Sequence, residues 1–277
     1  MKIKSKFWCD LNWCDFAQIQ SSADIDRVVA VLPVAAVEQH GPHLPVSVDL
    51  TLVNGVIQAS LSHMAEDLPV LILPTQAVGK SNEHERFPGT LTLSAQTLIQ
   101  VWMEIGECIA RVGIKKLVLF NAHGGQVSVM DIVARDLRAK HDLLVFSCSW
   151  YNLPMGSAVD AMFSADEHRF GIHAGAIETS MMLALEPRWV DMGQARDFSS
   201  SSRARASEYP ILGNGKSAKL GWQMQDYNPL GAAGNATQAT ATKGQALVDA
   251  ASQALAALLS EVSVLTDTLV AAPQQDD

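Results

Sequence analysis

The segment after the first apolar run carries two carboxylates and two histidines within twelve positions: Glu38, His40, His43 and Asp49. Because side chains two residues apart in an extended strand point to the same side, Glu38 and His40 are expected to reach neighbouring metal ions. Asp49 stands at the expected start of a helix, from which its two oxygens could bridge both ions. Carboxylates and imidazoles together suit zinc, manganese or iron. A surface or hydrogen-bonded Glu-x-His pair is the simpler alternative, and this cluster alone does not exclude it.

A second candidate ligand ends another apolar run. The segment KKLVLFNAHGGQ, residues 115–126, finishes with His123, Gly124 and Gly125. Open parallel sheets bind their ligands at the carboxyl ends of the strands, so His123 is expected at the same edge as the first cluster. The two glycines would let the backbone approach a substrate or a metal. The alternative is a tight turn with an incidental histidine.

The third cluster is HAGAIETS, residues 173–180, which contains His173 and Glu178. Glu178 precedes the apolar run MMLAL, so a buried carboxylate is expected. A buried carboxylate needs a partner, and a metal ion is a suitable one. A helix cap or a salt bridge remains the alternative.

Short apolar runs alternate along the chain with segments of helical period. These predicted strands and helices are the elements that must position the three clusters. Strands are predicted at residues 28–34, 70–74, 117–121 and 143–147, and helices at 50–66, 94–112 and 127–140, with Ser94 as an N-cap. The strands are apolar throughout, without polar alternation, which indicates a sheet covered on both faces. The predicted fold is therefore a three-layer α/β/α single domain, residues 1–277, with a largely parallel central sheet.

The second half of the chain is less regular. A loop-rich stretch runs to about residue 170 and a helix covers 175–185, before a loop-rich region at 193–243 and a C-terminal helix at 244–270. Arg196, Arg203 and Arg205 in the loop-rich region could contact an anionic group or lie in solvent. Three aromatic residues could line a pocket or simply pack in a core or interface: Trp150, Tyr151 and Trp222.

Composition limits the partners. The 277 residues are 48% hydrophobic with a net charge of −9, which argues against a nucleic-acid backbone or an anionic membrane as partner. No segment approaches the length of a signal-peptide core or a membrane span, so a cytoplasmic protein with a small-molecule substrate is expected. The four cysteines lack CxxC spacing and are expected to be reduced: Cys9, Cys14, Cys108 and Cys148.

Together these motifs resemble the creatininase family of metal-dependent amidohydrolases over about residues 28–244. The matching segments occur in order along the chain: PVAAVEQHGPHLPVSVD, SNEHERFPGTLTLS, NAHGGQ, HAGAIETS and GAAGNATQATATKG. The resemblance implies a Rossmann-like domain, a homohexamer and two divalent ions that serve C–N bond hydrolysis in cyclic amides or formamides. No GxGxxG or GxxxxGK[ST] run follows the first strand, so a nucleotide-binding function lacks support.

The resemblance also implies roles for the ligand candidates. Glu38 and His123 hold one ion, His40 holds the other, and Asp49 bridges them. Glu178 is the further ligand and takes part in catalysis.

Around this centre, the resemblance implies that His173 is catalytic and exchanges a proton near the substrate. Glu83 and His84 line the substrate pocket with Gly124 and Gly125, although Glu83 could equally be a solvated loop residue. Creatininase itself has a carboxylate where this chain has Gly125, which puts creatinine specificity in doubt.

The mechanistic hypothesis is that two ions bind a bridging water and lower its pKa, so that hydroxide attacks the amide carbon. Two alternatives stay open. One is a hydrolase or lyase that acts on a cyclic ketone or sugar-derived ring with the same ions. The other is a non-catalytic maturation partner that keeps the fold. Gln126, where such motifs commonly have asparagine, is expected to alter the hydrogen bonds near the site.

Overall fold

A computed structural model describes residues 2–266 and contains a four-stranded sheet whose strands are all parallel. Along the sheet the strands follow the order β2-β1-β3-β4. Their bounds are Val29–Val34 (β1), Val70–Ile72 (β2), Lys116–Asn121 (β3) and Leu144–Ser149 (β4). All four lie where the apolar runs predicted strands.

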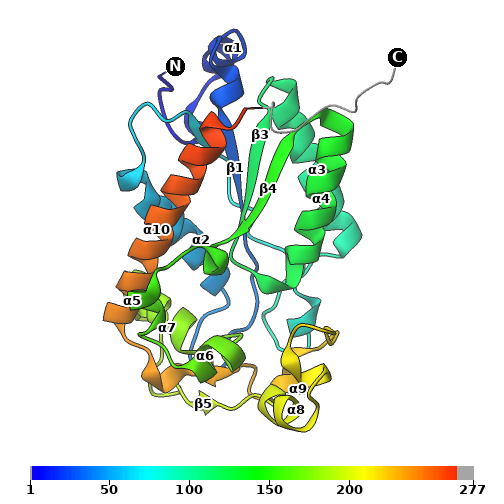
Figure 1. The fold of residues 1–277 in the computed structure, drawn as a ribbon, viewed down its shortest axis with the longest axis vertical. Helices are drawn as coiled ribbons and strands as arrows, with labels where there is room; N and C mark the ends of the chain where they lie inside the picture. Colours follow the sequence, from blue (N-terminus) through cyan, green and yellow to red (C-terminus); the bar gives the residue numbers. More distant parts are fainter. Residues whose placement is uncertain (1, 267–277) are drawn as a thin grey trace.

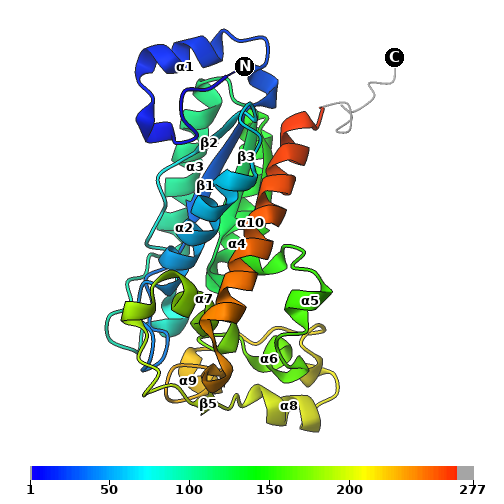
Figure 2. The ribbon, with the colours of Figure 1, turned by 90° about the vertical axis from the view of Figure 1, so that its left-hand side faces the viewer.

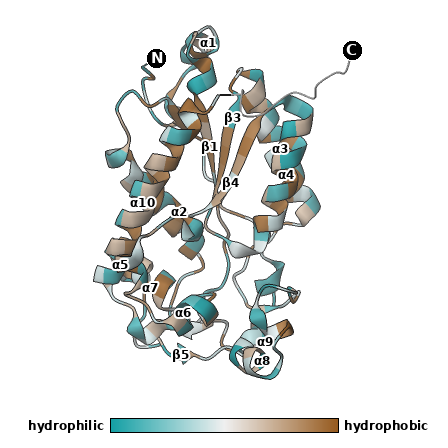
Figure 3. Cartoon of the chain, viewed as in Figure 1, coloured by the Kyte–Doolittle hydropathy of each residue, from teal (hydrophilic) through white to brown (hydrophobic). Residues whose placement is uncertain are grey.

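Helices cover both faces of this sheet, as Figure 1 shows. One face carries α2 (Val48–Ser60), α7 (Ala176–Leu185) and α10 (Ala241–Val264), and the other carries α3 (Ala95–Arg111) and α4 (Val127–His141). Alternate residues of β1 enter two separate cores, Val29 and Val31 on the first face and Ala30 and Leu32 on the second. In Figure 3 the strands are mainly brown, whereas α3 and α4 also show teal faces. The predicted three-layer fold is confirmed.

The predicted N-cap of α3 is also confirmed, because the Ser94 side chain accepts a hydrogen bond from the Thr97 N–H over 3.1 Å. This cap satisfies one of the helix's unpaired amide groups. At the C-terminal end of the next helix, α4, the C-cap residue Asp142 takes a left-handed conformation with φ 57°. Both helices therefore begin and end close to the predicted residues.

The strand order creates a switch point between β1 and β3. The chain moves from β1 to β2 on one side and then returns to place β3 on the other side of β1. The last residues of the two strands, Val34 and Asn121, lie side by side in register. The segments that leave β1 and β3 therefore diverge from one edge of the sheet, which is where open α/β folds bind ligands.

Beyond this edge the chain forms short elements, which Figures 1 and 2 show grouped at one end of the molecule. They are α5 (Ser157–Asp160), α6 (Ala165–Phe170), α8 (Ser202–Glu208), α9 (Met224–Tyr227), β5 (Asp197–Phe198) and β6 (Gly234–Asn235). The region at 193–243 is loop-rich as predicted. The stretch before residue 170 contains two short helices that the sequence pattern did not indicate, because neither is long enough to show a periodic apolar face. At the opposite end, α1 covers Trp13–Gln20.

Short 3-10 helices make most of the remaining connections. They are η1 (Trp8–Asp10), η2 (Ile25–Arg27), η3 (Leu61–His63), η4 (Asn82–His84), η5 (Gly124–Gln126), η6 (Trp150–Asn152), η7 (Pro187–Trp189), η8 (Leu212–Asn214) and η9 (Ala236–Gln238).

The helix α10 begins three residues before the predicted start and ends at Val264, and the predicted residues 267–270 lie outside the described part. Part of α10 has a mean hydropathy of 1.3, so this helix is long and apolar enough, by length and composition, to cross a membrane. The expectation that no segment approaches a membrane span was therefore wrong in this respect. Half of that part is buried within the fold, where α10 packs against α7 and α2. The helix thus serves the core of this protein.

Trp102 on α3 is fully buried in the second core, so Trp102→Ala should lower the free energy of unfolding by about 3–5 kcal/mol. Urea denaturation measures this loss. Trp13→Ala is the matched control, because Trp13 is 79% exposed and its removal should cost less than about 0.5 kcal/mol. Equal losses from the two variants would contradict the assignment of Trp102 to the core.

The cysteines are free thiols, and Cys148 on β4 is the least exposed of them. Burial raises the pKa of the Cys148 thiol to about 11, so it stays protonated at pH 8, whereas the thiolate is the reactive form. Iodoacetamide should therefore label Cys9, Cys14 and Cys108 of the folded protein at pH 8 and spare Cys148 until urea is added. Peptide mass mapping checks this, and rapid labelling of Cys148 in the folded state would refute it.

Candidate metal centre

The segments that follow β1 and β3 bring four predicted ligands together. Nδ1 of His123 lies 3.2 Å from Glu38 Oε2 and 3.4 Å from Asp49 Oδ2. Nε2 of His40 lies 3.5 Å from the other Asp49 oxygen, Oδ1. Asp49 occupies the first turn of α2, and all four side chains are buried. Each oxygen of Asp49 therefore faces a different histidine, which is the arrangement that a bridging carboxylate needs.

Backbone carbonyls determine which nitrogen of each histidine is protonated. Nδ1 of His40 donates to the Glu38 carbonyl over 3.0 Å, so its Nε2 presents a lone pair to Asp49. Nε2 of His123 donates to the Lys80 carbonyl over 2.9 Å, so its Nδ1 presents a lone pair to Glu38 and Asp49. Metal-binding histidines are oriented by this type of hydrogen bond on the distal nitrogen. A lone pair that faces a carboxylate is repelled unless a cation or a proton lies between them.

The start of α7 adds His173 and Glu178 to the centre. Ligand atoms of His40, His173 and Glu178 all lie within 4.8 Å of one another. The Ala174 N–H donates to Glu178 Oε2 over 2.5 Å, and His173 is held by two backbone hydrogen bonds to Ala233. Ala174 has φ 54°, a left-handed conformation that is uncommon for alanine and that turns the chain between the two side chains.

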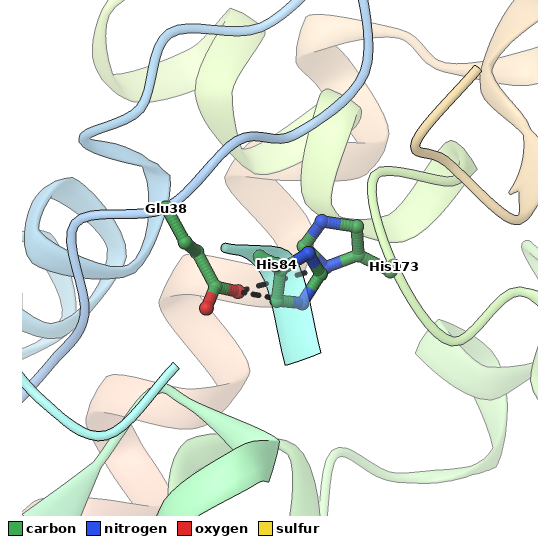
Figure 4. A group of neighbouring side chains, drawn as sticks. All are labelled: Glu38, His84 and His173. Carbon is green, nitrogen blue, oxygen red and sulfur yellow. Dashed lines mark ion pairs between the residues drawn. The ribbon is translucent and has the colours of Figure 1, made fainter. Parts of the chain in front are cut away.

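His84 lies deeper in the centre than the sequence suggested. Figure 4 shows Glu38, His84 and His173 grouped together, with His84 Nε2 3.5 Å and His173 Nδ1 3.7 Å from Glu38 Oε1. The Gln39 side-chain amide donates to His84 Nδ1 over 2.8 Å, so Nε2 carries the proton and faces Glu38. The protonated nitrogen of His84 therefore lies on the side of the carboxylate, at the distance of an ion pair. The Gln39 carbonyl accepts from His173 Nε2 over 2.8 Å, which leaves the His173 Nδ1 lone pair toward the centre.

Hydrogen bonds from residues outside the predicted ligand set hold Glu38 and the segment of His123 in place, and Gln126 contributes to them. Ser81 Oγ donates to Glu38 Oε2, and the His123 N–H donates to Asn121 Oδ1 over 2.9 Å. Gln126 is fully buried and donates to the same Asn121 oxygen over 2.9 Å. Only the position of Asn121 and Ser81 within the quoted motifs could have indicated these roles from the sequence.

The charges in the centre favour positive charge on its histidines. Burial alone would lower the pKa of His40, but the adjacent Asp49 carboxylate and the charges of Glu178 and Glu38 raise it to about 9. Burial would raise the pKa of Asp49, but the adjacent His123 and His40 rings hold it at about 2. Burial raises the pKa of Glu178 to about 7. Protons thus take the place that a cation would fill.

The donor set fits a divalent cation. Within residues 2–266, His40 Nε2, Asp49 Oδ2 and Glu83 Oε1 are buried atoms without a hydrogen-bond partner. Such atoms are costly to bury, and each of the three belongs to a group of potential ligands that also contains Glu38. Four groups of three potential ligands overlap here, and Glu38 belongs to three of them. Carboxylate and imidazole donors suit zinc, manganese or iron.

The centre opens into a cavity of about 550 Å³. Its lining includes the predicted pocket residues and the three aromatic residues that the sequence left undecided: Glu83, His84, Gly124, Gly125, Trp150, Tyr151 and Trp222. A neighbouring cavity of about 340 Å³ shares Trp222 and Tyr227 with it and is lined by Arg205. The other two arginines are engaged elsewhere, Arg203 with Asp166 and Arg196 with backbone carbonyls.

His43, from the first cluster, does not face the centre. Its Nε2 hydrogen-bonds Thr179 Oγ1 over 2.9 Å, and its ring stacks on Phe198 at 5.3 Å between centroids. Burial and the charge of His40 lower the pKa of His43 to about 4, so it is a neutral packing residue.

Glu167 is a buried carboxylate that sequence reasoning missed. Its oxygens accept the Ala176 N–H at 2.5 Å and the Asn235 N–H at 2.8 Å. These bonds join the first turn of α7 to β6, which lies next to the His173 bridge. No local sequence pattern indicates this role, because both partners of Glu167 are backbone N–H groups that lie elsewhere in the chain. Glu167 thereby holds in place the segment that presents His173 and Glu178.

Comparison with known proteins shows which family the chain is similar to. The profile of the creatininase family, described as creatinine amidohydrolase, matches residues 9–259. Creatinine amidohydrolase of Pseudomonas putida is 31% identical over 221 residues, which cover 75% of this chain and 82% of that protein. Mycofactocin precursor peptide peptidase of Mycobacterium ulcerans (strain Agy99) is 31% identical over 222 residues, which cover 78% of each chain.

Solved creatininase structures have the same fold. A manganese form and the zinc–zinc form of a mutant each superpose with a TM-score of 0.72 at 26% identity. Each alignment covers 93% of this chain and 98% of the other. The similarity in fold therefore extends through nearly the whole chain.

Replacement of Glu167 tests its structural role. Glu167→Ala leaves two backbone N–H groups unpaired, so the free energy of unfolding should fall by about 2–4 kcal/mol. Thermal and urea denaturation measure the loss. The exposed Glu208 provides the control, because Glu208→Ala removes the same charge without these bonds. If Glu167→Ala were as stable as Glu208→Ala, the carboxylate would not be holding the two segments together.

Proposed function

Because the chain belongs to the creatininase family, we propose that it hydrolyses a C–N bond of a small cyclic amide or formamide at two divalent ions. One observation carries the proposal. His40 and His123 each donate from the distal nitrogen to a backbone carbonyl and present a lone pair to opposite oxygens of Asp49. Two cations between these groups would remove the repulsion. The proposed ligands are Glu38, Asp49 and His123 for one ion and His40, Asp49 and Glu178 for the other.

In such a site, divalent ions polarise an amide carbonyl and increase the acidity of a water molecule. The contribution of the protein is to hold the ligands in the required tautomers before substrate arrives. Ser81 donates to Oε2 of Glu38, and Nε2 of His84 lies 3.5 Å from Oε1, so both neighbours orient that carboxylate. Lys80 and Glu38 supply the carbonyls that orient the two histidines.

His173 is the proposed proton carrier to the leaving nitrogen. Its Nε2 donates to the Gln39 backbone carbonyl, so a proton can be accepted and released only at Nδ1. This atom lies 3.7 Å from Glu38 Oε1, and both residues line the cavity. Burial and the neighbouring His40 and His84 hold the pKa of His173 well below its usual value. A proton gained there during bond cleavage is therefore released readily to a basic amine.

The cavity beside the metal centre is large enough to hold a small organic substrate. Its volume of about 550 Å³ falls in the range of small-molecule sites, and Trp150, Tyr151 and Trp222 supply flat apolar walls. Creatinine, a formamide and a peptide amide are all candidates, and the two curated relatives act on different substrates by name. We further propose a cytoplasmic homo-oligomer built from one domain.

Metal content tests the function directly. Purified protein should contain two ions per chain; His40→Ala should lose one and Asp49→Ala both, because Asp49 faces both histidines. Hydrolysis should fall below detection in both variants. Elemental analysis gives the metal content, and a panel of creatinine, formamides, lactams, short peptides and cyclic ketones gives the activity.

The exposed His63 supplies the control, since His63→Ala should keep both ions and full activity. Full hydrolysis by a metal-free sample would overturn the proposal. Turnover of the cyclic ketones alone would favour ring opening or enolate chemistry at the same centre.

A further inference from the structure

Glu83 presents a buried carboxylate oxygen that has no use in the scheme above. It belongs to the 3-10 helix η4, and the residue is 8% exposed. Its Oε2 lies 4.0 Å from Lys80 Nζ at the rim, whereas its Oε1 has no hydrogen-bond partner within residues 2–266. An unpartnered buried carboxylate oxygen is strongly unfavourable, so a cationic or donor group is expected beside it.

His123 supplies that group only in part. Its Nε2 lies 3.2 Å from Glu83 Oε1, but the proton on this nitrogen is directed to the Lys80 carbonyl at 2.9 Å. Its Nδ1 faces Glu38 and Asp49. Glu83 therefore lies beside the proposed ligands, but Oε1 receives no hydrogen bond of good geometry from any of them. Ligand atoms of Glu38, Glu83 and His123 nevertheless lie within 4.8 Å of one another, close enough to share an ion.

Gly125 explains how Glu83 reaches this position. A Cβ atom at residue 125 would lie 1.6 Å from Glu83 Oε1 and 2.5 Å from His123 Nε2. Both distances are far inside van der Waals contact. The Glu83 carboxylate thus occupies the space that any side chain at position 125 would need, and the two positions exclude each other.

We propose that Glu83 is a further carboxylate ligand of the metal centre, which contacts the ion held by Glu38 and His123. Residue 125 must then be a glycine, because the Glu83 carboxylate, which comes from a different loop, fills the space that a Cβ atom at residue 125 would occupy. This inference rests on the proposed metal centre and extends it, since Glu83 was expected only to line the substrate pocket. It gives that ion three carboxylates and one imidazole, all oxygen and nitrogen donors that suit zinc or manganese.

The experiment measures metal affinity and needs no substrate. Glu83→Gln keeps the shape of the side chain and removes its charge, so one of the two ions should bind about tenfold more weakly or worse. Titration of apo-protein with zinc and with manganese, in competition with a chromophoric chelator, gives both affinities. Glu85→Gln is the matched control, because Glu85 is an exposed glutamate two residues away and should bind both ions as the wild type does.

A swap of the two positions provides a second arm. Gly125→Glu alone should weaken binding and stability through the collision with Glu83, and Glu83→Gly alone should weaken binding only. The double variant, Glu83→Gly with Gly125→Glu, restores a carboxylate without the collision and should bind more tightly than either single variant.

Unchanged affinity for both ions in Glu83→Gln would overturn the inference, and so would a double variant no tighter than Glu83→Gly. If Glu83→Gln raised KM but bound both ions with wild-type affinity, Glu83 would be a substrate-pocket residue and not a metal ligand. Wild-type protein that binds no ions would instead refute the proposed function, so the two failures are distinguishable.

Discussion

The structure depends on one electrostatic constraint, the burial of several carboxylates against imidazole lone pairs. Glu38, Asp49, Glu83 and Glu178 converge with His40 and His123, whose protons point away to backbone carbonyls. Like-charged buried groups are unstable together unless positive charge lies between them. Without metal, the raised pKa of His40 indicates that protons supply that charge. With divalent ions, the same geometry becomes a preorganised ligand set.

The remainder of the fold holds these groups in that unfavourable arrangement. The parallel pairing of β1 with β3 fixes the starting points of two ligand segments, because Val34 and Asn121 end side by side. The packing of α10 against α7 supports the third segment, and the Glu167 carboxylate joins the start of α7 to β6. Two hydrophobic cores, one on each face of the sheet, supply the stability that opposes repulsion in the centre.

Substrate choice is a property of the cavity and its loops. The chain shares its fold with creatininases and is equally similar in sequence to a mycofactocin precursor peptide peptidase, so the fold does not discriminate between these activities. The family resemblance implies a carboxylate in creatininase where this chain has Gly125, and in this structure the Glu83 carboxylate fills the space that a side chain at Gly125 would need. The short helices α8 and α9 belong to the least regular region, and residues there line the adjoining cavity that contains Arg205.

The sequence alone determined the sheet, its covering helices and the principal ligand candidates. Uniformly apolar runs and helical spacing are local properties, and the strand-end rule then places Glu38, His40 and His123 at one edge. Only the tertiary structure decided that His43 packs against Phe198, that Glu167 joins two segments, and that Glu83 replaces a side chain at Gly125. These roles depend on contacts between residues far apart in the chain. A tautomer or a buried charge is set by the group that folding places against it, and that group leaves no periodic signal in the sequence.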